Sequence, residues 1–204
     1  MMTITWMGHA CFLLESGGYR VLLDPFKGVR GYPDTAARAD AVYCSHGHFD
    51  HAYTDEVTLT AGGASPFTIR EVDTFHDDQG GAARGSNTVR CLTAGGLTAV
   101  HLGDLGHQLT DEQAAAIGPC DALLIPVGGT YTLDAAGARA VVDRLKPRVV
   151  IPMHYRVGDK GLEVLDTVDS FLRLFPAEKV RRYPGQTFTL DRDTPDQVAV
   201  LAAP

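Results

Sequence analysis

The residues best suited to chemistry are six consecutive ones, His46-Gly47-His48-Phe49-Asp50-His51. They hold three imidazoles and one carboxylate, the ligand types that suit zinc and related divalent metals. His46 and His48 share one face of an extended chain, because alternate side chains point the same way. Asp50 and His51 are adjacent, so a turn there would direct them to a second position. The alternative is a histidine-rich surface loop, but the preceding apolar run places the motif at the end of a strand, which favours a two-metal site.

Three later residues that can bind metal each follow an apolar run of their own, namely His76, Asp104 and His154. A single histidine after a strand is usually structural. Three such residues after the six-residue motif are harder to explain as separate structural features, so we interpret them as further parts of one site.

The elements that must position these residues are strands at first, and then strands that alternate with helices. Strands are expected at 4–7, 11–14, 19–23, 41–44, 58–60, 67–72, 88–92, 97–102, 122–127, 149–151, 187–190 and 198–201. Glycine pairs at 17–18, 62–63 and 95–96 predict turns. Thr110 and Gln113 form a capping-box pattern that starts a short helix, and further helices are expected at 134–145 and 162–175. This pattern predicts one domain, 1–204, of mixed sheets covered by helices.

Composition narrows the function further. The chain of 204 residues is 45% hydrophobic, enough for a sizeable core. Its net charge is -7 and it has no basic run, which argues against a nucleic-acid surface, although bound metal would make a site locally positive. The four cysteines form no C-x-x-C pair and are expected to be buried free thiols. Neither a signal peptide nor a membrane-length apolar window is present, so we expect a cytoplasmic protein that does not bind membranes.

In this order, the motifs resemble the metallo-β-lactamase superfamily, and more narrowly its branch of small metal-dependent hydrolases that includes L-ascorbate-6-phosphate lactonase. The motifs that carry the resemblance span nearly the whole chain: Gly8-His9, Asp24-Pro25, Ser45 to His51, His76-Asp77-Asp78, His101-Leu102-Gly103-Asp104, Pro126-Val127-Gly128-Gly129 and Pro152-Met153-His154-Tyr155.

The resemblance implies an α/β fold, the four-layer αββα sandwich with two mixed β-sheets flanked by helices. It also implies two divalent metal ions, which we expect to be Zn²⁺, with Mn²⁺ or Fe²⁺ as alternatives. The first ion would be bound by His46, His48 and His76, the second by Asp50, His51 and His154, and Asp104 would bridge both.

We therefore predict a metal-dependent hydrolase in which a hydroxide bridging two metal ions cleaves a small ester, lactone or phosphoester. Asp50 and Asp104 are the predicted catalytic carboxylates, and His107 and Tyr155 are candidate proton donors. Two alternatives stay open: a phosphodiesterase or nuclease on the same site, and a non-catalytic metal-binding domain. The expected partner is a small-molecule substrate. The sequence leaves the oligomeric state open, with a homo-oligomer as one alternative.

Other residues near these motifs have both functional and structural interpretations. His9 can orient a ligand or be a hydrogen-bonded turn histidine, and Asp24 can hold a metal-binding histidine or form a turn. Arg84 and Asn87 can contact substrate or belong to a glycine-rich loop. His101 is expected to lie in the core or behind the ligands, since it is out of phase with Asp104.

Overall fold

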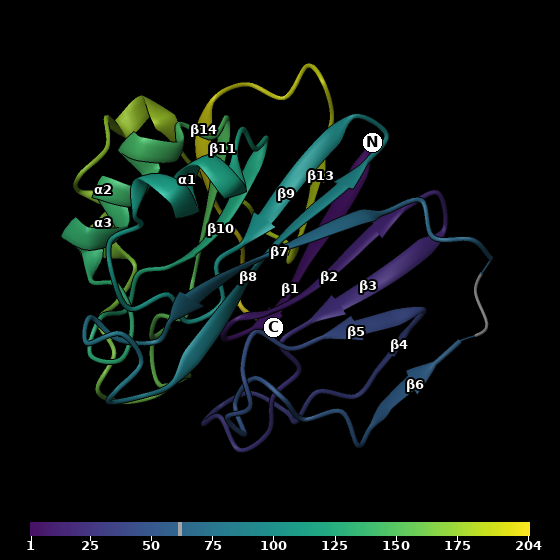
Figure 1. Ribbon diagram of the computed structural model, residues 1–204, viewed down its shortest axis with the longest axis horizontal. Coiled ribbons are helices and arrows are strands. Elements are labelled where there is room, and N and C mark those ends of the chain that lie inside the picture. The colour runs from purple at the N-terminus through teal and green to yellow at the C-terminus, as the bar shows by residue number, and fades with distance from the viewer. Residues whose placement is uncertain (61–62) are drawn as a thin grey trace.

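The computed structural model describes residues 1–60 and 63–204, so the turn predicted at 62–63 lies partly outside the described residues. Two mixed sheets form the body of the protein (Figure 1). The first has five strands in the order β13-β1-β2-β3-β5, antiparallel except where β3 pairs with β5. Its strands are β1 (Met2–Gly8), β2 (Cys11–Ser16), β3 (Tyr19–Leu23), β5 (Ala41–Tyr43) and β13 (Thr187–Leu190).

The second sheet has seven strands in the order β12-β14-β11-β10-β9-β8-β7. The pairs from β12 to β9 are parallel, and β8 pairs antiparallel with both β9 and β7. Its strands are β7 (Thr68–Phe75), β8 (Ser86–Ala94), β9 (Leu97–His101), β10 (Ala122–Pro126), β11 (Val149–Met153), β12 (Val180–Arg182) and β14 (Gln197–Val200).

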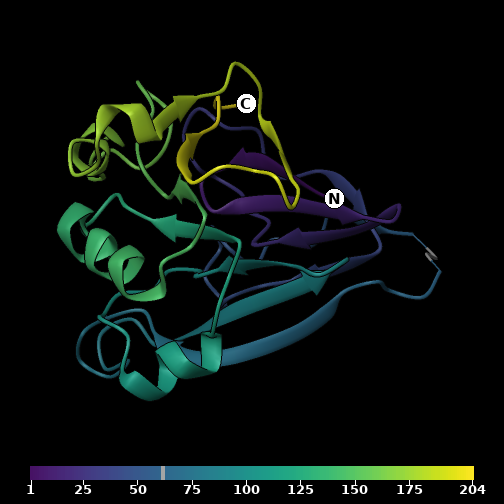
Figure 2. The ribbon, with the colours of Figure 1, turned by 90° about the horizontal axis from the view of Figure 1, so that it is seen from above.

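The layers are seen from above in Figure 2, where the purple N-terminal strands lie over the teal strands of the second sheet. A single large apolar cluster, which includes Trp6, Phe12, Leu92 and Ile151, lies between the sheets and under the helices. The helices α1 (Asp111–Ile117), α2 (Ala135–Leu145) and α3 (Asp169–Leu172) follow, with a 3-10 turn at Ala177–Lys179. α1 contacts β7 and α2 contacts β10, so the helices cover the seven-stranded sheet.

The five-stranded sheet is covered differently. A second cluster joins Phe26, Val29 and Tyr32 of the loop after β3 to Cys11 and Leu22 of the sheet. Beside that loop lies a small parallel pair, β4 (Ala37–Ala39) and β6 (Val57–Leu59). The predicted α/β sandwich of two mixed sheets is confirmed, while in the described part of the chain its fourth layer is this loop and strand pair rather than a helix.

Helix boundaries follow local chemistry where capping residues are present. α1 has the predicted capping box: Thr110 accepts from the Gln113 amide at 3.2 Å, and the Gln113 side chain accepts from the Thr110 amide at 3.0 Å. α2 starts at the Asp134 cap, as expected. The helix predicted at 162–175 is wrong for most of its length, since only α3 forms there. Leu165, Val168 and Leu172 are buried at helical spacing, but the amide of Asp166 instead bonds to the carbonyl of Gly128 in another loop.

The site residues follow strands that end on one side of the molecule. His46 comes after β5, His76 after β7, Asp104 after β9 and His154 after β11. β9, β10 and β11 are parallel neighbours, so their carboxyl ends meet at one edge of the sheet, where α/β proteins build sites. No helix in the described residues is both long and apolar enough to cross a membrane.

Candidate metal centre

Asp104 is the centre of the histidine cluster. Its carboxylate is almost fully buried, and Oδ2 lies 3.1 Å from Nε2 of both His51 and His76. The same oxygen is 3.4 Å from His154 Nε2 and 4.0 Å from His46 Nε2. Two nitrogens bound to one tetrahedral zinc lie about 3.3 Å apart, given bonds of 2.0–2.1 Å. These separations are therefore those expected of ligands that share metal ions.

Three histidines near Asp104 form one candidate metal-binding group, which we call the open group: His46, His48 and His76. His46 Nε2 and His48 Nδ1 are 3.0 Å apart, which confirms that these two residues turn toward the same point. His48 is exposed, whereas the His46 and His76 side chains are only 4% and 3% exposed. This group therefore combines two fixed imidazoles with one that faces solvent.

Four other residues form a second candidate metal-binding group, which we call the buried group: His9, Asp50, His51 and His154. None of the four is more than 8% exposed. Asp50 Oδ2 lies 3.3 Å from His9 Nε2 and 3.9 Å from His51 Nε2, and the rings of His9 and His154 are 4.1 Å apart between centroids. The structure thus brings all seven predicted ligands together in the expected two sets around Asp104, and adds His9 to the second.

Asp24 supports a histidine of each group. Its Oδ2 accepts from His51 Nδ1 at 2.8 Å and from the Ser45 hydroxyl at 2.6 Å. That hydroxyl is in turn 2.9 Å from His46 Nδ1. Such contacts to the remote ring nitrogen fix the tautomer and direct Nε2 toward a metal. The contact between Asp24 and a predicted ligand is confirmed, and it reaches both groups.

Asn87 positions the backbone of Asp104. Its Oδ1 accepts from the Asp104 amide at 2.9 Å, and its Nδ2 donates to Thr74 Oγ1 and the Leu102 carbonyl at 2.8 and 2.9 Å. The residue is fully buried, so the suggestion that Asn87 contacts substrate is wrong. Gly103 is required beside it, because its φ is +56° and a Cβ there would lie 2.3 Å from Asn87 Oδ1.

His9 and His154 are held together through their backbones. Both have left-handed φ values of 52°. The His9 carbonyl accepts from the His154 amide at 3.1 Å and from Trp6 Nε1 at 3.0 Å. Since a left-handed φ is uncommon outside glycine, these two contacts help to hold the backbone from which both rings extend.

Among the residues that the structure describes, several buried nitrogen and oxygen atoms of the cluster have no hydrogen-bond partner, as expected of atoms that bind a metal. Within residues 1–60 and 63–204, no hydrogen bond satisfies His51 Nε2, His154 Nε2 or Asp104 Oδ1. Buried polar atoms are seldom left without a partner, so these three indicate a missing ligand. Burial lowers the pKa of His46 to about 3 and that of His9 to about 4, which keeps both rings neutral. Neutral imidazole is the form that binds metal.

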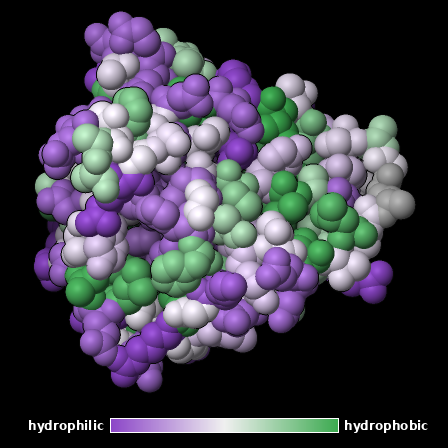
Figure 3. Space-filling model, turned by 60° about the horizontal axis from the view of Figure 1, so that its bottom comes forward, coloured by the Kyte–Doolittle hydropathy of each residue, from purple (hydrophilic) through white to green (hydrophobic). Residues whose placement is uncertain are grey.

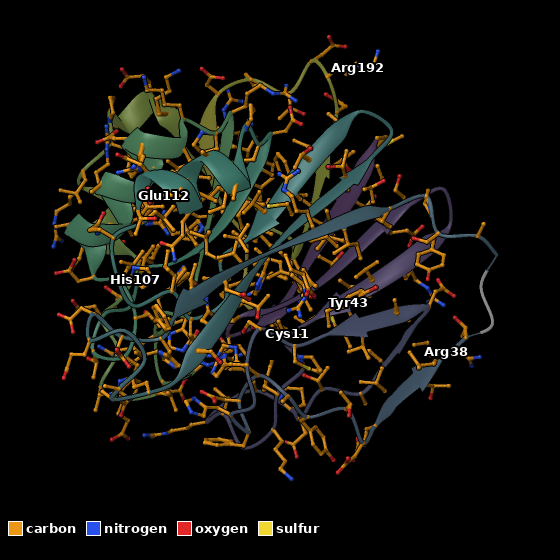
Figure 4. All side chains as sticks on the ribbon, viewed as in Figure 1. Cys11, Arg38, Tyr43, His107, Glu112 and Arg192 are labelled. Carbon is orange, nitrogen blue, oxygen red and sulfur yellow. The ribbon has the colours of Figure 1, made fainter. Side chains whose placement is uncertain are left out.

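The two predicted proton donors, His107 and Tyr155, lie outside the histidine cluster around Asp104. His107 accepts from the Phe75 amide at 3.1 Å and contacts the Gln108 carbonyl at 2.8 Å, and Figure 4 shows it below Glu112 of α1. Tyr155 is buried against Trp6, with ring centroids 5.4 Å apart, and burial raises the pKa of its hydroxyl. The structure thus places neither side chain among the residues that line the pocket over Asp104.

His101 is a core residue. Its Nε2 contacts the Ala10 carbonyl at 2.8 Å, and its Nδ1 accepts from the Gly103 amide at 3.1 Å. Both nitrogens are thereby satisfied, which confirms the expectation drawn from its position relative to Asp104.

The cluster forms the floor of a pocket of about 580 Å³. From the cluster, His48, Asp50, His76 and Asp104 line the pocket. The other side chains that line it are those of Phe49, Arg84, Tyr131 and Leu162. Figure 3 turns the lower side of the molecule forward and shows a hollow among hydrophilic residues, with hydrophobic residues beside it. A pocket of this size suits a small molecule.

Sequence comparison agrees with the geometry. A family model described as a beta-lactamase superfamily domain matches residues 3–154. A UPF0173 metal-dependent hydrolase of Carboxydothermus hydrogenoformans is 31% identical over 193 residues, covering 76% of this chain and 84% of the relative. Another protein of that description, from Archaeoglobus fulgidus, is 32% identical over 196 residues, covering 76% of this chain and 83% of the relative.

Structural comparison extends the similarity to the whole chain. A crystal structure of a metallo-beta-lactamase superfamily protein from Thermotoga maritima is 37% identical, covers all of both chains and has a TM-score of 0.79. A metallo hydrolase from Ignicoccus hospitalis shares the fold at 22% identity, with a TM-score of 0.58 over 76% of this chain and 83% of the other.

Proposed function

Because this chain belongs to the beta-lactamase superfamily and is a metal-dependent hydrolase, we propose that it hydrolyses a small ester, lactone or phosphoester at a dinuclear centre. The centre comprises the open group, the buried group and Asp104 between them. Zinc is the proposed metal, since the set is rich in imidazole.

One observation carries this proposal: Asp104 Oδ2 lies within 4.0 Å of a nitrogen from each of four histidines. Because two of these histidines belong to the open group and two to the buried group, this one carboxylate is suited to join two metal positions. When bound there, two divalent ions would supply the Lewis acid and the hydroxide that hydrolysis requires.

The protein's own residues have separate tasks in this scheme. His46, His48 and His76 hold one position and Asp50, His51 and His154 the other, while Asp24 keeps His51 and His46 correctly oriented. Asp50 also lines the pocket, which places its carboxylate where it can take a proton from the attacking water and pass it to the leaving oxygen. In this scheme the ester or phosphoester bond breaks, water oxygen joins the acyl or phosphoryl centre, and the proton passes to the leaving oxygen.

The test combines metal analysis with turnover. We expect two divalent ions per chain by mass spectrometry, and hydrolysis of p-nitrophenyl esters or lactones that a chelator abolishes and added Zn²⁺ restores. Turnover of bis-p-nitrophenyl phosphate alone would overturn the ester and lactone assignment in favour of a phosphodiesterase. Metal binding without turnover of any ester, lactone, thioester or phosphoester would favour a non-catalytic domain.

A further inference from the structure

Arg84 adds a positively charged side chain to the pocket, which the predicted metal ligands do not provide. It lies on the loop after β7, and among the pocket-lining residues that the structure describes it is the one lysine or arginine. The same pocket is bounded below by His76 and Asp104. A cation therefore stands on the wall, beside the place where the reaction would occur.

The loop that carries Arg84 is built on one carboxylate. Asp77 Oδ1 accepts from the amides of Gln79 and Gly81, both at 2.8 Å. Its Oδ2 accepts from the amides of Ala83 and Arg84, at 3.0 and 2.7 Å. The backbone of Arg84 is thus fixed relative to the residue that follows the ligand His76.

The two ends of this loop are also joined to each other. The His76 amide donates to the Gly85 carbonyl at 3.0 Å, and the Gly85 amide donates to the Gly81 carbonyl at 2.9 Å. A long side chain that starts from a fixed backbone loses less entropy on binding, so this loop pre-organises Arg84.

The guanidinium of Arg84 rests on an aromatic ring. Its Cζ is 4.4 Å from the centroid of Tyr131, which lies on the loop after β10 and also lines the pocket. Within the described ranges, no carboxylate forms an ion pair with Arg84 and no hydrogen bond uses its guanidinium. Stacking fixes the plane of the group and leaves its N–H donors free for a ligand.

We propose that Arg84, stacked on Tyr131, binds a second, non-reacting anionic group of the substrate, a carboxylate or a phosphate. This inference rests on the proposed function and narrows its substrate class to esters, lactones or phosphoesters that carry such a group. The planar guanidinium matches either anion with two parallel hydrogen bonds. Phe49, which is 56% exposed, and Leu162 line the same pocket and provide an apolar surface for the rest of the substrate.

The first experiment compares two esters that differ in charge, p-nitrophenyl acetate and the mono-p-nitrophenyl ester of glutaric acid. We expect the wild-type protein to prefer the anionic ester in kcat/KM. Arg84→Gln should reduce that preference about tenfold or more, mainly through KM, since a charge-assisted hydrogen bond is lost. Arg84→Lys should recover only part of the preference for the anionic ester, because lysine keeps the positive charge but not the planar guanidinium that donates two parallel hydrogen bonds.

Arg181→Gln is the matched control, since Arg181 is an exposed arginine of β12, at the opposite edge of the sheet from β7. It should retain the wild-type preference. Equal preference in wild type and Arg84→Gln, or no preference in the wild type, would overturn the proposal.

A second measurement does not depend on turnover. Isothermal titration of glutarate and of inorganic phosphate into the metal-free and the metal-loaded protein should show binding that Arg84→Gln weakens about tenfold and Arg181→Gln leaves in place. The two titrants distinguish carboxylate from phosphate. If no ester is hydrolysed, the proposed function fails, and anion binding insensitive to Arg84→Gln would overturn this inference by itself.

Discussion

The open group and the buried group differ in how the protein surrounds them, although both meet at Asp104. His48 of the open group is exposed at the pocket, whereas His51 and His154 of the buried group are at most 1% exposed. The buried group also has the additional imidazole of His9. If both groups bind metal as proposed, this contrast predicts that His48 is the imidazole most accessible to substrate, while His51 and His154 are held by the core.

The largest effect is expected at Asp104, the residue that lies close to histidines of both groups. Asp104→Ala should remove metal from both positions, because the one carboxylate between them is lost. We expect kcat/KM to fall by more than the roughly 10- to 100-fold that follows loss of an outer partner. Mass spectrometry of metal content is the direct measurement, with the exposed Asp193→Ala as control. Two ions still bound to Asp104→Ala would refute its bridging role.

The supporting contacts of Asp24 provide a second way to separate the groups. Asp24→Asn should weaken metal binding about 10- to 100-fold. The larger effect should fall on the buried group, since His51 contacts Asp24 directly. Ser45→Ala interrupts only the path to His46, so its smaller effect should be confined to the open group. Titration against a competing chelator resolves the two affinities, and equal losses at both positions in Ser45→Ala would contradict this account.

Proton release should also distinguish the groups. Burial alone would lower the pKa of His51, but the adjacent Asp104 and Asp24 outweigh it and hold that pKa well above the usual value. Metal must therefore displace a proton from His51 at neutral pH, and affinity at the buried group should rise about tenfold per pH unit up to that pKa.

Binding to the open group should carry no such proton cost at His46, whose pKa burial lowers to about 3. Calorimetry in buffers of different ionisation enthalpy counts the protons released at each position. Equal proton release from both positions would show that the contrast between His51 and His46 is wrong.

The smallest expected effect concerns His9. His9→Asn keeps a residue that tolerates the left-handed φ of 52° but shortens the side chain, so its contact with Asp50 at 3.3 Å is lost. Loss of one hydrogen bond should weaken metal at the buried group roughly threefold to tenfold. His51→Asn is the comparison variant. If both substitutions removed the metal completely, His9 would be a ligand rather than a support for Asp50.

Some structural expectations failed where local pattern competed with tertiary contacts. Leu165 and Val168 are buried at the spacing of a helix, but the segment before α3 instead bonds to loops elsewhere in the chain. Tyr155 is next to His154 in sequence, yet it packs on Trp6, because the backbone turns at His154, whose φ is 52°. Proximity in sequence was therefore a poor guide to which side chains line the pocket.

The sequence by itself determined which residues can bind metal, because that capacity belongs to the side-chain types. The structure divides the six-residue motif as predicted, although residues 45–51 form bends and turns rather than a strand. The sequence also determined the capping box of α1, which depends on residues only three apart. Metal binding by those residues remains a prediction. Only the tertiary structure decided that Asp24 contacts His51 directly and His46 through Ser45, that His9 joins the buried group and that Arg84 stacks on Tyr131. Each of these contacts joins residues brought together by sheet pairing and loop packing, which no local spacing records.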